Sequence, residues 1–290
     1  MSLSINTNPA ALHALHNLNR TTSQLNETQL RIDTGLQVTS AKDNATIFAV
    51  AENLRADRKS LEMVKNSLDR AASVLDVTLA AAESGPDLLS QRKERGSRAA
   101  QAGEPDDGRA ALQKDFESLR DQIITIVRNA SFNGINMIDG WADGAERPAT
   151  LAALISVDGA QKIEVPRQNL QLPQAANDLV PGHLIRLGQD STFTSAAEAE
   201  ALIDALNTSL ENVSGALAVL GAGSTAMEQQ RTFIEKLGDT MDTGIGSLVD
   251  ANLARESARL QALQVKQQLG TQSLSIANQQ PHAILSLFGN

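Results

Sequence analysis

Four histidines, His13, His16, His183 and His282, are the side chains best suited to metal binding or to acid and base chemistry at neutral pH. His13 and His16 stand three residues apart, so both fall on one face of a helix and can in principle share a metal ion. No carboxylate stands near this pair, and the HExxH pattern of zinc proteases does not occur. We therefore interpret the histidines as packed or solvated side chains, and we expect no metal centre and no cofactor.

Other kinds of chemical site find little support in the sequence. The chain has no cysteine, which excludes disulfides and thiolate metal sites. It also has no GxGxxG or GKS loop that would cradle a phosphate. Its one tryptophan, Trp141, can stack on a sugar ring, as aromatic residues of carbohydrate sites do, although packing at the base of a hairpin is the more ordinary interpretation. We expect no enzymatic activity.

Charge and hydropathy narrow the classes of partner. A net charge of −9 argues against a nucleic-acid surface. The one locally basic run, residues 92–98 (RKERGSR), contains Glu94 and no aromatic residue, so we interpret it as a solvated helix face. No apolar run reaches the roughly 20 residues that span a bilayer, and no secretory signal pattern opens the sequence. These features indicate a cytoplasmic protein, unless export uses a route that reads no cleavable signal.

The positions of proline indicate where long helices fit. A proline inside a helix costs about 3 kcal/mol, and the eight prolines leave two long windows free, residues 10–85 and 182–280. The composition agrees, because aromatic residues make up only 2% of the chain and the core must come from aliphatic side chains. Long helices are therefore expected on both flanks of an irregular middle.

Apolar residues in the first window recur at alternating steps of three and four from Ile47 to Leu75. This spacing predicts a helix over residues 44–83 that Gly85 and Pro86 end. A second break is expected at residues 103–108, which are rich in glycine and acidic residues. Similar amphipathic spacing predicts further helices within residues 11–36, 112–126, 202–248 and 249–274.

The middle of the chain has the signals of strands and turns. Residues 155–157 and 162–165 predict a short hairpin around residues 158–161, and the Asn-Gly and Asp-Gly pairs of residues 129–140 predict turns. A β and loop insert is expected at about residues 141–193, and Thr194 and Ser195 after it can cap the returning helix. The predicted fold class is mainly α, a long antiparallel helical rod with paired N- and C-terminal coiled-coil helices and a small β-hairpin insert.

The two ends of the chain differ from the rest in charge. Residues 267–290 contain no Asp, Glu, Lys or Arg in a chain that is 20% charged, and the first forty residues place leucine and isoleucine among Asn, Thr, Ser and Gln. Uncharged amphipathic helices need to be covered, and head-to-tail association through them gives an open helical polymer. The residues predicted to form this polymerisation interface are Leu15, Leu18, Leu25, Ile32, Leu260, Leu263, Leu274 and Leu285.

Four blocks of sequence carry a resemblance to a known family. They are residues 4–8 (SINTN), 31–44 (RIDTGLQVTSAKDN), 132–134 (FNG) and 267–288 (QQLGTQSLSIANQQPHAILSLF). Together they resemble bacterial flagellin, and the compact middle is similar to the short flagellins of alphaproteobacteria. The resemblance covers about the first 140 and about the last 95 residues.

This resemblance implies a structural subunit that polymerises into the flagellar filament, exported without a cleaved signal peptide to the cell exterior. It implies self-association and contacts with a flagellar export chaperone and with filament cap and junction proteins. Residues 1–43 with 248–290 would form the terminal coiled-coil domain, and residues 44–247 the helical rod domain. Two alternatives stay open: a hook-filament junction protein, which the uninterrupted SAKDN block fits less well, and a cell-surface polysaccharide-binding relative of flagellin.

Residues 89–96 (LSQRKERG) are similar to the stretch of flagellin that a Toll-like receptor reads. The resemblance implies an Arg, then a Glu with an adjacent Leu on one helix, and a second acidic residue on the next helix. In the register anchored on Glu94, this chain places Gln91 at the Arg position and Arg95 at the Leu position. Asp115 falls at the second acidic position.

Both replacements weaken the expected contact with the receptor. Without the Arg, a charge-assisted donor is lost, and an arginine at the Leu position brings a charge into an apolar contact. We therefore expect weak or absent receptor activation. A register shift of one residue would instead bring Arg92 to the Arg position.

Overall fold

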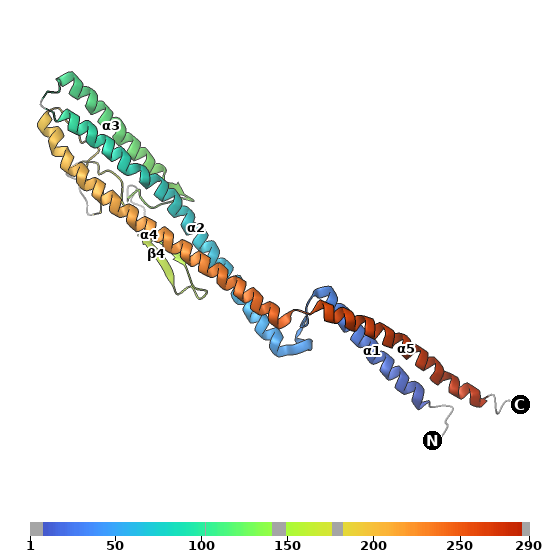
Figure 1. The fold of residues 1–290 in the computed structure, drawn as a ribbon. Helices are drawn as coiled ribbons and strands as arrows, with labels where there is room; N and C mark the ends of the chain where they lie inside the picture. Colours follow the sequence, from blue (N-terminus) through green and yellow to red (C-terminus); the bar gives the residue numbers. More distant parts are fainter. Residues whose placement is uncertain (1–7, 102, 141–148, 176–181, 286–290) are drawn as a thin grey trace. The chain divides into compact units, whose positions relative to one another are not determined.

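The computed structural model describes residues 8–101, 103–140, 149–175 and 182–285 (Figure 1). Within these residues the chain forms five helices and two small antiparallel sheets. Their order is α1 (Pro9–Thr34), α2 (Ala41–Ala99), α3 (Asp106–Asn129), β1 (Ser131–Phe132), β2 (Ile135–Asn136), β3 (Thr150–Leu154), β4 (Lys162–Pro166), α4 (Ala196–Val249) and α5 (Leu253–Leu285).

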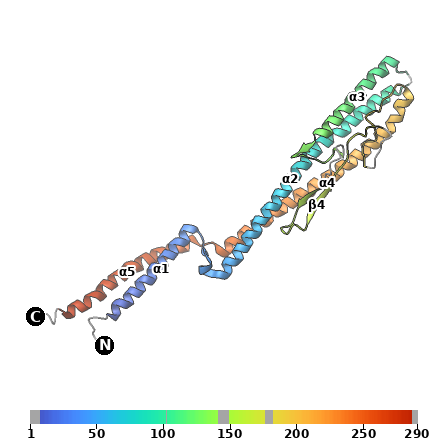
Figure 2. The same ribbon diagram turned by 180° about the vertical axis from the view of Figure 1, so that it is seen from behind.

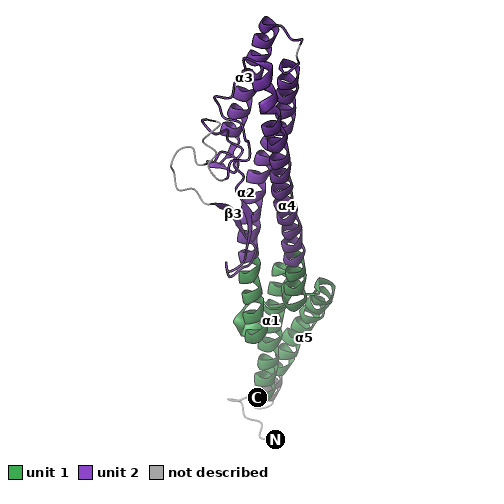
Figure 3. Cartoon of the chain, turned by 90° about the vertical axis from the view of Figure 1, so that its left-hand side faces the viewer, with its two compact units in different colours: residues 1–58, 239–290 green, residues 59–238 purple. Residues whose placement is uncertain are grey.

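The chain separates into two compact units, which Figure 3 colours differently. Unit 1 consists of residues 1–58 and 239–290, and unit 2 consists of residues 59–238. The long helices α2 and α4 each run from one unit into the other. The limits expected from the sequence lie closer to the chain ends, after residues 43 and 247, and they stay a prediction.

Unit 1 is organised around the two connections that join its helices. Helix α1 ends at Gly35, which has a φ of 71° that favours glycine, and the segment after it forms a bridge with the start of the α4–α5 connection. The Gln37 amide donates to the Val249 carbonyl at 2.7 Å, and the Ala251 amide donates to the Gly35 carbonyl at 2.8 Å. Behind these bonds lies a small apolar cluster of Val38, Ala51, Ile245 and Val249.

Helix α2 contains two irregular points. Asn44 is extended, with a φ of −160°, and its side-chain oxygen accepts from the amides of Thr46 and Ile47, so the long helical run starts here as the sequence predicts. The predicted stop at Gly85 and Pro86 is wrong, because α2 continues to Ala99. Apolar residues on either side of the proline are buried, and this burial outweighs the local penalty of the proline ring. They are Ala82, Leu88 and Leu89.

In unit 2, α2, α3 and α4 lie side by side in both views (Figures 1 and 2), with α2 and α4 antiparallel. Ion pairs join α2 to α4: Lys65 lies 2.7 Å from Glu235, and Arg231 lies 3.3 Å from Asp69. The hydrogen bond from Lys65 is the main reason that the pKa of Glu235 lies below its ordinary value, and Arg231 adds to the effect. The apolar core between the helices includes Leu68, Leu75, Phe116, Val213 and Leu220.

Helix α4 begins with a capping box. The Ser195 hydroxyl accepts from the Glu198 amide at 3.3 Å, and the Glu198 carboxylate accepts from the amides of Thr194 and Ser195. The caps that the sequence predicts at Thr194 and Ser195 therefore act together. The carboxylate that completes the box is part of the helix itself.

Two hairpins complete unit 2. The β1–β2 turn places Asn133 and Gly134 at φ values of 50° and 77°, which confirms the Asn-Gly turn signal. In the second hairpin β3 pairs with β4, so the predicted second strand is confirmed, but the first lies in residues 150–154 and not in 155–157. Residues 155–157 belong to the connecting loop, where the Ser156 hydroxyl donates to Asp158.

The second hairpin packs against α4 at a glycine. A Cβ atom placed on Gly223 would stand 2.5 Å from a methyl carbon of Val165 in β4, so only glycine lets the strand approach this closely. The predicted fold class is confirmed in its main features, a mainly helical chain whose N- and C-terminal helices pack together, with small two-stranded sheets inserted.

Candidate assembly surface

The two terminal helices α1 and α5 pack against each other along one stripe of each helix. Leu25 in α1 and Leu263 in α5 are buried in this seam, 8% and 4% exposed. Gly270 permits close approach, because a Cβ atom at this position would stand 3.2 Å from a methyl carbon of Leu18. The α1–α5 pair is thus a packed unit within a single chain.

Polar contacts fix the antiparallel register of this pair at both ends. At one end, the Asn8 side-chain amide donates to the Ala277 carbonyl at 2.7 Å while its oxygen caps α1 by accepting from the Ala11 amide. At the other end, Arg31 lies 3.8 Å from Glu256 at the start of α5. Because these contacts are far apart along the helices, they define one register of the pair. They do not involve the apolar residues on its outer faces.

The outer faces of the pair expose a second set of large apolar residues. In α5, Val265, Leu269 and Ile276 follow helical spacing on the side opposite to Leu263, so this helix is apolar on two faces. Helix α1 can cover only one of them. The outer set is between 42% and 59% exposed and consists of Leu12, Leu15, Leu30, Leu253, Val265, Leu269 and Ile276. We call these seven residues the outer set.

The interface residues predicted from the sequence divide between the two faces. Leu25 and Leu263 lie in the seam, and Leu15 belongs to the outer set. The side chain of Leu285 lies outside the described residues. Four others are half-buried along the α1–α5 pair: Leu18, Ile32, Leu260 and Leu274.

Sequence reasoning missed most of the outer set. Its signal is present in α5, where Val265, Leu269 and Ile276 repeat at steps of four and seven, two residues out of phase with the stripe that contains Leu263. A single heptad assignment cannot include both stripes. The outer set is therefore visible only once the structure shows which stripe the chain itself covers.

The histidines form no site in the part of the chain that the structure describes. His13 and His16 are exposed on α1, and Nδ1 of His183 lies 3.0 Å from the Gln171 carbonyl. The side chains of His282 and Trp141 fall outside the described residues. Among described residues, no group of three or more His, Asp or Glu side chains stands close enough to hold a metal ion.

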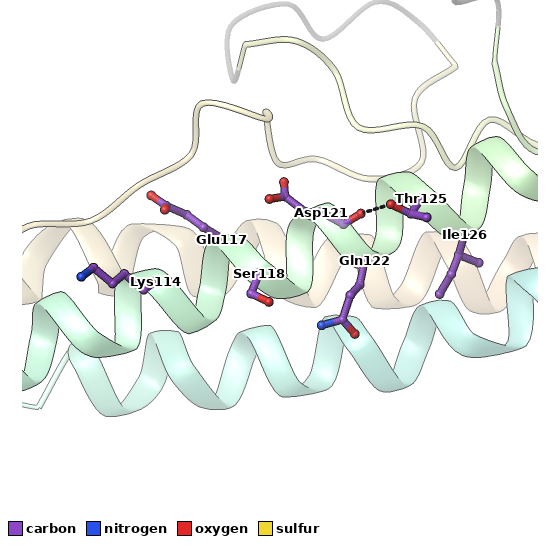
Figure 4. Close-up of a pocket in the computed structure, with 7 residues that line it drawn as sticks. All are labelled: Lys114, Glu117, Ser118, Asp121, Gln122, Thr125 and Ile126. Atoms are coloured by element: carbon purple, nitrogen blue, oxygen red, sulfur yellow. Dashed lines mark hydrogen bonds between the residues drawn. The ribbon is translucent and has the colours of Figure 1, made fainter.

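A shallow groove lies on α3 in unit 2 (Figure 4). Its residues all come from this one helix, so they cannot surround a ligand, and Thr125 donates its hydroxyl hydrogen to the Asp121 carbonyl at 2.7 Å within the same helix. The groove measures about 530 Å³ and is lined by Lys114, Glu117, Ser118, Asp121, Gln122, Thr125 and Ile126.

The region similar to the receptor-reading stretch has a defined arrangement on α2. Gln91 and Glu94 are exposed, and Arg95 forms ion pairs with Glu94 at 3.2 Å and with Asp115 of α3 at 3.3 Å. The expectation of a fully solvated basic run is wrong at Arg92, whose side chain is completely buried. Its position turns it toward α3, where it packs on the ring of Phe116.

These features define a class of protein: a helical subunit whose paired terminal helices leave apolar faces that further copies can cover. Comparison with known sequences gives the family. Residues 5–143 match the family model of the bacterial flagellin N-terminal helical region, and residues 203–288 match that of the C-terminal helical region. The chain belongs to the bacterial flagellins.

Individual relatives agree over nearly the whole length. The chain is 45% identical to flagellin FljO of Caulobacter vibrioides over 285 residues, which cover 98% of both proteins. It is 33% identical to a flagellin of Brucella melitensis over 288 residues, or 98% of this chain and 99% of the relative. A protein of Vibrio parahaemolyticus described as flagellar hook-associated has a TM-score of 0.57 at 14% identity, over 72% of this chain and all of that chain, and shows the fold alone.

Membership of this family settles the broad function. The chain is a structural, non-enzymatic subunit of the extracellular flagellar filament, which serves motility. The sequence relatives favour flagellin over the junction protein, whereas the likeness to the Vibrio protein concerns the fold that both share. None of the helices that the structure describes combines the length and the apolar content needed to cross a bilayer.

Proposed function

We propose that this flagellin polymerises through the outer set of α1 and α5, with a second copy of the chain as the occupant of each exposed face. The observation that supports this is the two-sided apolar character of α5. One face packs on α1 around Leu263, and the other exposes Val265, Leu269 and Ile276. Covering these three side chains on assembly removes apolar surface from water, which favours the polymer.

Charge supports the same occupant. From Gln267 onward α5 contains no ionised side chain, and α1 contains only four charged residues, two acidic and two basic. The charged residues of α5, Arg255, Glu256, Arg259 and Lys266, all precede this stretch, so the second half of the helix presents no charge that would repel a second copy. Because the faces of α1 and α5 differ, the contact is head-to-tail and propagates as an open polymer. On this proposal, the assembling part comprises residues 1–43 with 248–290, and residues 44–247 form the other domain.

Seeded polymerisation of the purified full chain tests this proposal. Short filament seeds are added to monomer, and elongation is followed by electron microscopy and sedimentation. A variant with Val265, Leu269 and Ile276 changed to serine should stay in the supernatant while retaining the helical circular dichroism of the wild type. Filaments of wild-type length from this variant would contradict the proposed interface.

Further partners follow from the family resemblance. We propose that the chain binds a flagellar export chaperone before assembly and contacts the filament cap and junction proteins at the ends of the polymer. Export without a cleaved signal peptide belongs to the same proposal. Mass spectrometry of the protein recovered from filaments tests the export part of this proposal. An intact N-terminal segment is expected, and a shortened one would refute export without cleavage.

We also propose that this flagellin activates the flagellin-sensing Toll-like receptor weakly or not at all. Gln91 supplies no charge at the exposed position, and Arg95 is held by Glu94 and Asp115, so both it and the second acidic residue are already paired. Arg92 is buried and offers no donor to a receptor, which argues against the shifted register.

A receptor reporter assay on the monomer tests this proposal. The double variant Gln91→Arg with Arg95→Leu is expected to gain signal over the unmodified chain. Potent signalling by the unmodified monomer, or no gain from the double variant, would count against the assignment.

A further inference from the structure

Two buried arginines of unit 2, Arg109 and Arg92, differ in how their guanidinium groups are satisfied. Arg109, at the start of α3, is 9% exposed and donates from all three nitrogens. Nε donates to the Ala99 carbonyl at 3.1 Å, Nη2 to the Glu104 carbonyl at 3.1 Å, and Nη1 to Asp106 at 3.0 Å. This arginine closes the α2–α3 connection by satisfying the carbonyl of Ala99 at the end of α2 and that of Glu104 in the connection itself.

Arg92 has the opposite environment. Its side chain is 0% exposed, and none of its three nitrogens has a hydrogen-bond acceptor in the described part of the chain. It packs on Phe116, whose ring centroid lies 3.9 Å from the central guanidinium carbon. A cation over an aromatic face is attractive, but it does not replace the five hydrogen bonds that the guanidinium makes in water.

The group nevertheless keeps its charge at neutral pH. Burial, and to a lesser extent the nearby charge of Arg120, lower the pKa of Arg92 to about 9, against the opposing effect of Asp121. A pKa of about 9 leaves almost every molecule protonated at pH 7. Arg92 is therefore a buried positive charge without a hydrogen-bonded counterion, an arrangement that opposes folding.

A short segment covers the same aromatic cluster. Residues 189–195, which we call the strap, follow the β insert and lead into α4. The Phe193 ring packs edge-on against Phe116 with centroids 5.3 Å apart, and the Phe193 amide donates to the Gln113 side chain at 2.9 Å. Arg120 donates to the Gln189 carbonyl at 2.7 Å. This ring contact and these two hydrogen bonds to side chains help to hold the strap on α3.

We propose that Arg92 limits the stability of unit 2 and that the strap opens locally to let water reach its guanidinium. Closing the strap buries Phe193 and completes the aromatic cluster, while opening it hydrates the charge. The two effects oppose each other, so this opening requires less free energy than global unfolding. Arg109, whose nitrogens are all paired, gains nothing from such an opening.

Paired substitutions test the proposal on the full chain below its assembly concentration. Arg92→Met keeps the approximate volume and removes the charge, so the Tm of unit 2 should rise by at least about 3 °C. Hydrogen exchange at the Phe193 amide should slow at least tenfold. Arg109→Met should lower the Tm, because it leaves two carbonyls unpaired, and Arg98→Met, at an exposed position of α2, should change neither quantity.

A second measurement uses the wild type alone. Phenylglyoxal modifies accessible arginines, and peptide mapping gives the rate at each position. Arg92 should react more slowly than the exposed Arg98 and faster than Arg109. The proposal is overturned if Arg92→Met leaves the Tm unchanged or lowers it, including by unfolding the chain, or if Arg92 reacts no faster than Arg109.

Discussion

Replacing Leu269 by alanine separates assembly from folding. Leu269 is 56% exposed in the single chain, so the substitution should hardly affect the stability of the α1–α5 pair. Burying a whole leucine stabilises by about 1.5 to 3 kcal/mol, and about half of this side chain remains to be buried on assembly. Adding a small packing loss, we expect about 1 to 2 kcal/mol per subunit, or a 5- to 30-fold higher critical concentration.

The assay is sedimentation of seeded filaments over a range of monomer concentrations, with circular dichroism of the monomer recorded in parallel. Leu263→Ala provides the contrast, because this residue is 4% exposed in the seam and its truncation should cost about 2 to 5 kcal/mol of the pair itself. That variant should lose helix in the monomer as well as assembly. Asp158→Asn, on the β3–β4 loop, is the control and should assemble normally. An unchanged critical concentration for Leu269→Ala would refute the role given to the outer set.

Three further predictions concern other parts of the chain. Removing residues 1–40 and 250–290 should leave a helical monomer that does not sediment with seeds; a truncated chain that still polymerised would exclude the terminal helices as the driving element. The pKa of Asp43 lies below its ordinary value of 3.8 because Thr39 and then Ser40 donate hydrogen bonds to it, so its stabilising contribution is present above pH 3.8 and is lost as the pH falls through the lowered value. Helix content measured by circular dichroism should fall at a higher pH in Asp43→Asn than in the wild type, and identical acid transitions would contradict this. Gly223→Ala should lower the free energy of unfolding, measured in urea, by about 1 to 3 kcal/mol, because the added Cβ clashes with Val165 of β4. Gly221→Ala should not lower it, because a Cβ atom at Gly221 has no other atom within 4 Å.

Local signals in the sequence predict much of the fold. The order of the helices, the Asn-Gly turn at Asn133 and the caps before α4 depend on neighbours within a few residues, which is why periodicity and turn chemistry find them. Pro86 shows the limit of such reasoning, because its penalty is local while the burial of Leu88 and Leu89 comes from distant parts of the chain. The prediction misplaced the first strand of the second hairpin for a related reason. The alanines of residues 152–153 have low strand propensity, and it is their pairing with β4 that makes them part of the strand.

The burial of Arg92 runs against its residue type but not against its spacing. It stands in a run of charged residues, which favours a solvated helix face, whereas the steps of three and four that link Ile47 to Leu75, continued along α2, reach Leu89 and Arg92 and place this position on the buried face. The burial follows from the position of Phe116 on another helix, which supplies an aromatic face at 3.9 Å. Contacts of this kind, made by residues far apart in the sequence, are set by the packing of α2 on α3.

The location of the exposed apolar residues also argues for assembly through the terminal helices. Among described residues, α1 and α5 expose seven large apolar side chains, whereas unit 2, which contains more than half of the chain, exposes six: Met63, Phe132, Ile135, Val157, Val219 and Phe233. Those of unit 2 are spread over two helices and both hairpins, and scattered single residues are ordinary for a protein surface. In α5 they repeat on one face of a single helix, which only another apolar surface can cover. Residues buried inside one chain build the helix pair, and on the proposed interface the residues left exposed on that pair would join it to the next copy.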